Sequence, residues 1–490
     1  MTSSAHSIDR RRWIALALVV AAQFMVVLDI AIVNVALPSI GKDLDFSAAN
    51  LQWVVSAYAI LFGGFLLLGG RLGDIFGRRR LFVAGLALFA FASLLCGLSW
   101  SEGSLIAFRG LQGLGGALLA PATLSILMTT FAEGPERNLA LGIWGAVSGS
   151  GAAAGVLLGG LLTSYLSWSW IFFINVPIGI AVIAAAPRWL PESRVEAAER
   201  AFDAAGAVLA TGGLSLLVYA LVQTVDHSWT APRTIAMFIV AAAMLVGFVA
   251  TEARAKHPLM PLGIFRNRSL SAANAVGLML GASVFSMFFL LTLYMQQVLG
   301  YDALKTGVGY LTVATAIVIS AGASQALVTR IGVRTVLGTG MALTAIGLVY
   351  FTQVSVNGSY LIDLVPGFLL TGVGLGFSFV PVSIAALVGV QHDEAGIASG
   401  IINTSQQVGG ALGTAILSTV AFTQTANYVT DHLPATAAVQ AHAAVDGFSM
   451  AFGVGAGLAA IGVVLTLAFI PRQTPQEIMA AEPAAEPVSG

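Results

Sequence analysis

The chain has 490 residues, of which 57% are hydrophobic and only 9% carry a charge, and its mean hydropathy is +0.89. Soluble domains carry about 25% charged residues, so this composition excludes a soluble globular protein and indicates an integral membrane protein. The single cysteine, Cys96, excludes an intrachain disulfide and any cysteine-based metal cluster. We expect membrane lipid as a partner, no nucleic-acid partner, no metal and no cofactor.

Apolar runs long enough to cross a bilayer recur along the whole chain. About 20 apolar residues in a helix span the ~30 Å hydrocarbon core. The fold class we predict is therefore all-helical and integral to the membrane. We predict fourteen transmembrane helices, at residues 13–37, 50–70, 81–99, 104–128, 138–163, 168–187, 205–224, 233–252, 270–297, 306–329, 334–352, 360–390, 395–422 and 447–470.

The distribution of positive charge predicts the orientation of these helices. With a cytoplasmic N-terminus, 18 of the 22 Lys and Arg residues fall on the cytoplasmic side, and only Lys42, Arg233 and Lys305 fall outside. Arg109 lies within a predicted helix. Positive charges accumulate in cytoplasmic loops, so both termini are expected in the cytoplasm of a protein in the cell membrane.

An internal repeat divides the chain into two halves. Gly142, Gly151 and Gly155 recur 258 residues later as Gly400, Gly409 and Gly413. Such an offset indicates two related six-helix halves, as in alternating-access transporters. The predicted segments are a basic tail at 1–12, an N-terminal half at 13–187, a linker at 188–204, an extra helix pair at 205–252, a loop at 253–269, a C-terminal half at 270–470 and a disordered tail at 471–490.

Asp29 lies deep inside the first predicted helix. A charge at such depth costs at least ~2.5–3.5 kcal/mol on insertion scales, so it is normally paired, protonated or in contact with a wet cavity. Asp29 is either a structural hydrogen-bond anchor or a proton-binding site. All six histidines lie in tails or loops, which leaves no histidine relay inside the membrane.

Arg109 and Gln112 lie at a similar depth on another predicted helix. From the expected outer helix ends, Arg109 is ~7 Å deep, Gln112 ~12 Å and Asp29 ~13 Å. An unpaired intramembrane arginine is costly, and Asp29 is the other charge clearly within the core. We therefore predict a direct or water-bridged contact between Asp29 and Arg109.

Four motifs resemble those of the major facilitator superfamily, and specifically its fourteen-helix drug:proton antiporter family. They are Leu28–Pro38, Gly70–Arg80, Arg109–Ala117 and the glycine repeat from Gly151 to Gly160. The resemblance covers about residues 13–470 and fades in the C-terminal half. It implies proton-coupled export, with Asp29 as the group that is protonated and Arg109 as its partner.

The resemblance also gives roles to two further sets of residues. In the turn between the second and third helices, a cluster of this kind can latch the two halves together, and ordinary positive-inside topology is the less favoured alternative. The residues are Gly70, Asp74, Gly77, Arg78 and Arg79. The glycines Gly151, Gly155 and Gly159 either serve close helix packing or form the family's antiporter signature, in which Val156 here replaces a proline.

The C-terminal half has no carboxylate well inside a predicted helix, so the expected substrate cavity is apolar, aromatic and amide-lined. The residues we assign to it are Asn34, Tyr58, Gln112, Tyr294, Gln297, Asn403 and Gln406. Such a cavity suits small lipophilic, weakly specified substrates, and the resemblance implies that they are exported in exchange for protons. We expect the protein to work as a monomer. The alternatives are export of one endogenous metabolite or import of a nutrient. A membrane enzyme or sensor is disfavoured, because the chain lacks a Ser/His/Asp set, metal-ligand spacing and a phosphate-binding loop.

Overall fold

The computed structural model describes residues 3–131, 135–193, 203–224, 230–255, 258, 262–390 and 395–472. Within these residues the regular structure is entirely helical, as the fold class predicted. The helices of the first part are α1 (Ser3–Asp43), α2 (Ala48–Leu51), α3 (Trp53–Phe76), α4 (Arg78–Gly97), α5 (Glu102–Thr130), α6 (Pro135–Tyr165), α7 (Trp170–Phe173), α8 (Asn175–Trp189), α9 (Ala204–Gln223) and α10 (Pro232–Glu252). The second part has η2 (Leu262–Arg266), α11 (Arg268–Leu293), η3 (Tyr294–Val298), α12 (Ala303–Ile331), α13 (Val333–Phe351), η4 (Tyr360–Leu364), α14 (Val365–Leu387), α15 (Ala395–Asp431) and α16 (Ala437–Phe469).

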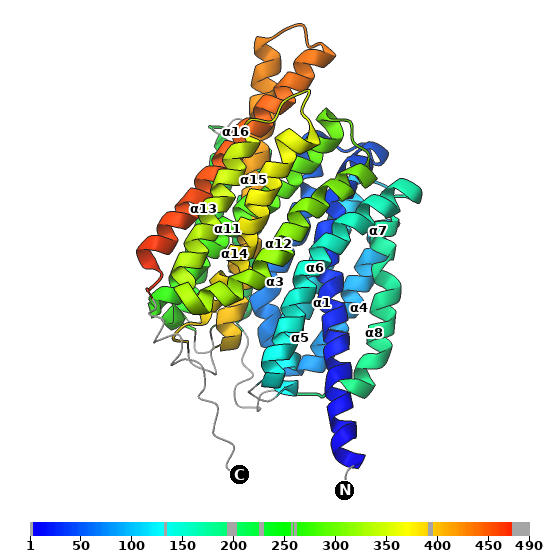
Figure 1. Cartoon of the computed structure of the whole chain (residues 1–490), viewed down its shortest axis with the longest axis vertical. Helices are drawn as coiled ribbons and strands as arrows, with labels where there is room; N and C mark the ends of the chain where they lie inside the picture. Colours follow the sequence, from blue (N-terminus) through cyan, green and yellow to red (C-terminus); the bar gives the residue numbers. More distant parts are fainter. Residues whose placement is uncertain are drawn as a thin grey trace.

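Each of the fourteen predicted spans coincides with a long helix, the sixth being formed by α7 and α8 together. Eleven helices in the described part are long and apolar enough to cross a membrane. The predicted ends were less accurate than the predicted spans. Helix α1 begins at Ser3 rather than Trp13, so most of the expected basic tail is helical and projects beyond the bundle (Figure 1). The expected disordered tail lies outside the described residues from 473 onward.

The last two spans were predicted at 395–422 and 447–470, which leaves a loop at 423–446, and this prediction is wrong. Instead, α15 continues to Asp431 and α16 begins at Ala437, and together they form a helical hairpin that projects from the bundle (Figure 1). Gln424 Nε2 donates a hydrogen bond to Asp446 Oδ2 at 2.7 Å, and Thr436 caps the second helix. Falling hydropathy marks where a helix leaves the membrane, but it does not end the helix.

The internal repeat is visible in the backbone. Gly77 ends α3 with φ 107° and ψ 132°, and Gly332, 255 residues later, ends α12 with φ 83° and ψ 154°. Both are positive-φ positions, which only glycine adopts at little cost. In each half a sharp turn thus reverses the chain between two long helices.

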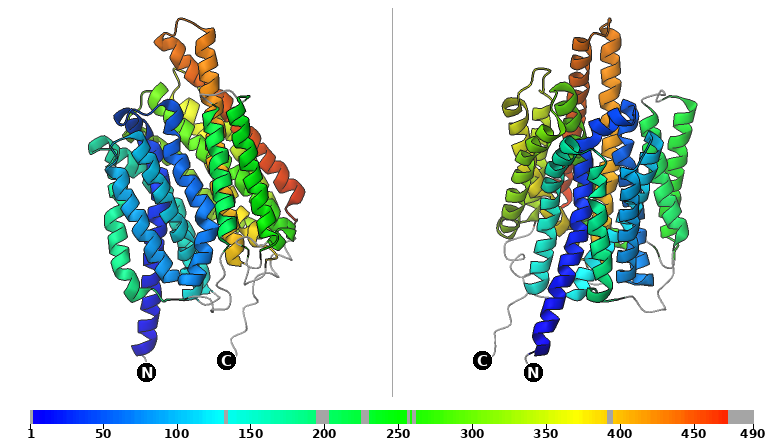
Figure 2. Two further views of the ribbon diagram at one scale, coloured as in Figure 1. Left: turned by 180° about the vertical axis from the view of Figure 1, so that it is seen from behind. Right: turned by 90° about the vertical axis from the view of Figure 1, so that its right-hand side faces the viewer.

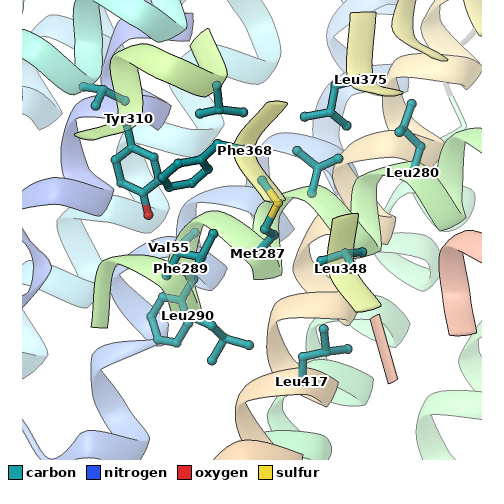
Figure 3. Packing of buried hydrophobic residues seen from close by; sticks show 14 of the residues in the cluster. Val55, Leu280, Met287, Phe289, Leu290, Tyr310, Leu348, Phe368, Leu375 and Leu417 are labelled. Carbon is teal, nitrogen blue, oxygen red and sulfur yellow. The ribbon is translucent and has the colours of Figure 1, made fainter. Parts of the chain in front are cut away.

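Helices α1–α8 pack into one bundle and α11–α16 into another, and the two bundles stand side by side (Figures 1 and 2). We call these bundles the N-terminal and C-terminal halves. One cluster of buried apolar residues extends across both halves. Figure 3 shows part of it, with Val55 of α3 in the same cluster as Tyr310 and Phe368, whose ring centroids lie 5.5 Å apart.

The contacts between the halves concentrate at the end of the bundle opposite the start of α1, which we call the distal end. A Cβ atom at Gly160 would lie 2.8 Å from Ala303 O, and one at Gly307 would lie 2.7 Å from Val156 O, so α6 and α12 touch through their backbones. Gln296 Nε2 also donates to Val35 O at 2.7 Å. Toward the other end, which we call proximal, the two bundles diverge (Figure 1).

Helices α9 and α10 form a layer at the side of the two halves. Helix α9 contacts both α3 and α15, whereas α10 packs mainly on α9. Thr211 Oγ1 donates to Gly64 O of α3 at 3.1 Å, and Thr419 Oγ1 of α15 donates to Leu221 O at 3.2 Å. Helix α10 turns large apolar side chains outward, among them Ile239, which is 62% exposed. The extra pair is therefore peripheral in the described structure.

This placement can be tested with two tryptophan substitutions two residues apart on α10. Ile239→Trp should leave thermal stability in detergent unchanged, because this side chain faces outward. Ala241→Trp should lower the free energy of unfolding by about 1–3 kcal/mol, because Ala241 is fully buried and the site would be overpacked. Equal melting temperatures for the two variants would contradict the peripheral packing of α10.

Candidate functional site: a buried charge network

Asp29 and Arg109 form an ion pair in the interior of the N-terminal half. Arg109 Nη1 donates to Asp29 Oδ2 at 2.6 Å, and the two side chains are 1% and 0% exposed. A buried charge is strongly unfavourable unless it is both paired and hydrogen-bonded. The predicted contact between the two residues is therefore present, and it is direct.

Three other groups hold the guanidinium of Arg109 in place. Its Nε donates to Val54 O of α3 at 2.9 Å, and its Nη1 also donates to Gln112 Oε1 at 2.6 Å. The guanidinium carbon lies 4.4 Å from the centre of the Tyr58 ring, at a cation–π distance. Several partners in fixed directions thus orient the positive charge toward α1.

Two amide side chains complete the environment of Asp29. Gln112 Nε2 donates to Asp29 Oδ1 at 2.8 Å, and Asn175 Nδ2 donates to the same oxygen at 3.0 Å. Both amides also donate to Ser93 Oγ, at 3.0 and 2.9 Å, and Ser93 donates to Phe172 O at 3.0 Å. All of these side chains are fully buried, so the carboxylate has a set of donors without solvent.

The local sequence explains how four helices converge on Asp29. Arg109 and Gln112 are three residues apart on α5 and therefore share one helix face. Ser101 begins α5 with a capping box, which fixes where its turns fall. Asn175 is the first residue of α8. Sequence analysis missed both Asn175 and Ser93. The signal that could have found Asn175 is a polar amide inside the span predicted at 168–187.

The residues assigned to the substrate cavity do not all come together. Tyr58 and Gln112 belong to the Asp29 network, whereas Asn34 donates back to Ile30 O of its own helix at 3.0 Å. Tyr294 donates to Ser355 O at 2.8 Å inside the C-terminal half, and Gln297 is exposed. The structure therefore does not bring Tyr294 or Gln297 to the Asp29 network.

Two further residues of this set lie on α15, facing other helices of the bundle. Asn403 and Gln406 are partly buried. The backbone of Gln406 packs on Gly281 of α11, where an added Cβ atom would lie 2.0 Å from Gln406 O. The neighbouring Gln407 reaches α3, and its Cβ would lie 3.3 Å from a Cβ placed on Gly63. This part of α15 thus lies where the two halves meet.

In the turn at residues 76–80, a carboxylate from the end of the N-terminal half meets the arginines. Glu192 Oε1 accepts a hydrogen bond from the Arg79 backbone N–H at 3.1 Å, and its other oxygen lies 3.5 Å from Arg79 Nε. Arg78 N–H donates to Ser193 O at 2.9 Å. Gly70 lies within α3, and the side chain of Asp74 lies outside the described residues. Sequence analysis missed Glu192.

The glycines of α6 face α1 directly beside Asp29. A Cβ atom at Gly155 would lie 2.8 Å from Leu28 O, the carbonyl that precedes Asp29. Gly159 has the same relation to Ile32 O at 2.9 Å, and Gly151 faces Val27 at 3.2 Å. Such small-residue faces let membrane helices approach at backbone distance. Close packing of α6 therefore sets the position of the helix that carries Asp29.

The chain belongs to the Major Facilitator Superfamily, whose family model matches residues 19–414. This is a family of transporters, so the chain is a membrane transporter and not an enzyme. Two solved structures share the fold, at 13% and 18% identity: a bacterial homologue of the human lysosomal transporter Spinster in an inward-facing, unoccupied conformation (TM-score 0.64, 95% of this chain and 99% of that chain) and the peptide transporter POT in complex with sulfate (TM-score 0.66, 94% of each).

Relatives of known name are similar over most of their length. The puromycin resistance protein pur8 of Streptomyces alboniger is 38% identical over 95% of this chain and 93% of its own. The cephamycin export protein CmcT of Amycolatopsis lactamdurans is 41% identical over 83% and 84%, and the tetracenomycin C resistance and export protein of Streptomyces glaucescens is 37% identical over 84% and 76%.

The described residues include no group of three or more His, Cys, Asp or Glu side chains that could hold a metal ion.

The contact between α6 and α1 predicts the effect of one added methyl group. Gly155→Ala should push α1 away at Leu28 and lower the melting temperature of the purified protein, because backbone atoms on both sides cannot yield. Gly457→Ala on α16 is the matched control, since nothing lies within 4 Å of its Cβ position, and it should be neutral. A Gly155→Ala protein as stable as the control would show that α6 does not fix α1.

Proposed function

We propose that this chain is a proton-coupled antiporter that exports lipophilic small molecules, of the fourteen-helix drug:proton antiporter type. The observation that carries the proposal is the buried Asp29–Arg109 pair, in a transporter whose relatives are named for antibiotic resistance and export. A membrane-embedded carboxylate with an arginine partner is typical of proton-coupled transport. The proton gradient would be the only energy source, without a cofactor.

Asp29 would be the proton-coupling residue and Arg109 its counter-ion. The pair lies wholly within the N-terminal half, and proton arrival would weaken the attraction between α1 and α5. Because α6 packs against Leu28, a small displacement of α1 at this point would be passed to α6 and from there to its contact with α12. The network thereby provides a physical link between protonation and the surface on which the two halves meet.

The arrangement of the halves supports alternating access. Contacts at the distal end and divergence at the proximal end suit an inward-facing state, with both termini in the cytoplasm of a cell-membrane protein. In the opposite state the proximal ends would close, and Gly70, Asp74, Gly77, Arg78 and Arg79 would latch the halves. Glu192 holds Arg79 within the N-terminal half here, so it would compete with that latch.

The substrate would be bound between the halves, near α1, α3 and α15. Asn34, Asn403 and Gln406 offer amide groups among apolar side chains, which suits small lipophilic compounds held with few specific hydrogen bonds. We propose that the protein works as a monomer, with lipid, protons and these compounds as its partners. A narrower alternative is export of a single compound, which the names of the three relatives described above favour because each of these names one antibiotic.

Replacing the proton-binding carboxylate tests the coupling directly. Asp29→Asn should abolish proton-driven export while leaving membrane insertion intact, because an amide side chain does not take up a proton as a carboxylate does. The measurement is the accumulation of a lipophilic fluorescent dye in cells, with and without a protonophore. A coupling site elsewhere would be indicated if the variant still lowers dye accumulation and if the protonophore still reverses this effect.

The counter-ion is tested by a pair of substitutions. Arg109→Ala should lower the free energy of unfolding by about 3–5 kcal/mol, because it leaves a buried carboxylate unpaired. Arg109→Lys should cost less, since it keeps the charge but loses the fixed geometry toward Val54, Asp29 and Gln112. Thermal unfolding of the purified variants is the measurement. Adding Asp29→Asn to Arg109→Ala should restore part of the loss, and strict additivity of the two changes would contradict the pairing.

A further inference from the structure

Among the described residues, every hydrogen bond to the side chain of Asp29 is donated by the partner and accepted by the carboxylate. Its Oδ1 accepts from Gln112 and Asn175, and its Oδ2 accepts from Arg109. Among the described residues, no acceptor atom is hydrogen-bonded to either oxygen. A carboxylate only accepts hydrogen bonds, so these donors satisfy it. A protonated carboxyl group must also donate its O–H to an acceptor. The observed geometry is therefore that of the deprotonated site.

A spare acceptor lies on one of the three partners of Asp29. Asn175 Oδ1 is buried and, among the described residues, has no hydrogen-bond partner. Gln112 Oε1 already accepts from Arg109, and Ser93 Oγ already accepts from both amides. Arg109 carries donors only. Of the described side chains bonded to Asp29, only that of Asn175 therefore has a buried acceptor without a partner.

We propose that Asn175 is a positioning residue whose amide turns over when Asp29 takes up a proton. In the deprotonated state Nδ2 donates to Asp29 Oδ1, as observed. After a half-turn about the Cβ–Cγ bond, Oδ1 accepts the proton of the neutral carboxyl group. This torsion is broad and roughly two-fold, so the rotation needs no change in volume. The inference rests on the proposed function, because it assumes that Asp29 is protonated during transport.

The surroundings of Asn175 suit an amide with two orientations. In the observed orientation Nδ2 donates to both Asp29 and Ser93, while Oδ1 lacks a partner among the described residues. The half-turn gives up the bond to Ser93 and gains the bond from the neutral carboxyl group, so the observed orientation is favoured until Asp29 takes up a proton. Ser93 keeps its bond from Gln112 when Asn175 turns away. Buried polar networks that are fully satisfied become rigid, whereas one unsatisfied atom leaves room for a second arrangement.

The charge that changes in this network is that of Asp29. Arg109 on α5 supplies the opposite charge that faces it. The other titratable groups near Asp29 are Tyr58 on α3 and Cys96 on α4, which interact electrostatically with both Asp29 and Arg109. Among the described residues, α8 adds only the neutral Asn175 to this network, and α6 faces α1 with glycines. A pH-dependent change of the Asn175 amide would therefore report protonation of Asp29.

The proposal is tested by pH-difference infrared spectroscopy of the purified protein in lipid nanodiscs, which needs no transport. Substitution Asp29→Asn assigns the carboxyl C=O band, and carbon-13 labelling of asparagine assigns the amide bands. In the wild-type protein, an asparagine amide C=O band should shift together with the Asp29 carboxyl band, because Oδ1 changes from unbonded to accepting. If the carboxyl band of the wild-type protein titrates and no asparagine band changes with it, the proposal is wrong. This result requires only the wild-type protein, so it does not depend on whether the variants fold.

The variant Asn175→Leu should remove that amide band and raise the proton affinity of Asp29 by about tenfold, because the lost bond to the carboxylate is charge-assisted and stronger than the lost bond to the neutral form. The matched control is Asn274→Leu, which removes a buried amide of the C-terminal half that donates to Leu270 O at 2.8 Å. It should leave the Asp29 band and its titration unchanged.

The outcomes separate the two proposals. If Asp29→Asn leaves the carboxyl bands intact, the assignment of Asp29 as the proton site is wrong. If Asp29→Asn removes the band, but Asn175→Leu alters neither the amide band nor the titration, the proton site stands and the turning amide is wrong.

Discussion

The constraint on which this structure depends is the cost of burying an ion pair inside a helix bundle. Asp29 and Arg109 have no access to water, so each must find its hydrogen bonds within the protein. This requirement brings α1, α4, α5 and α8 to one point and fixes the rotation of each about its axis. The rest of the N-terminal half packs around that point, with glycines wherever two backbones must approach closely.

The two halves share a repeat, but different kinds of contact hold their turns and fill their interiors. The turns at Gly77 and Gly332 have nearly the same backbone, yet the N-terminal turn is held by Glu192, whereas Arg334 of the C-terminal turn bonds to the carbonyl oxygen of Leu467. The interior of the C-terminal half is dominated by aromatic contacts such as Tyr310 with Phe368. Among the described residues, the buried ion pair therefore lies in the N-terminal half.

Sequence analysis predicted the fold class, the positions of the long helices and the meeting of Asp29 with Arg109, because hydropathy and helix depth fix these features. It did not find Asn175 or Ser93, since a single amide or hydroxyl costs too little in a membrane helix to stand out. It also assigned Gln297 to the cavity between the halves, whereas the neighbouring Gln296 makes the contact there. The reason is the π-helical turn η3 after α11, which changes the direction in which each side chain points. The helical hairpin was missed since polarity and helicity are independent beyond the bilayer.

The order in which the network residues are synthesised has a consequence for biogenesis. Asp29 leaves the ribosome before its partners, since Arg109 follows 80 residues later and Asn175 146 residues later. At about 5–20 residues per second, the carboxylate waits roughly 4–16 s for its counter-ion and longer for its last amide. During that interval the nascent helix carries an uncompensated group that disfavours its insertion by ~2.5–3.5 kcal/mol. The long apolar stretch that surrounds Asp29 must therefore hold α1 in the bilayer until the helices that carry its partners have been synthesised.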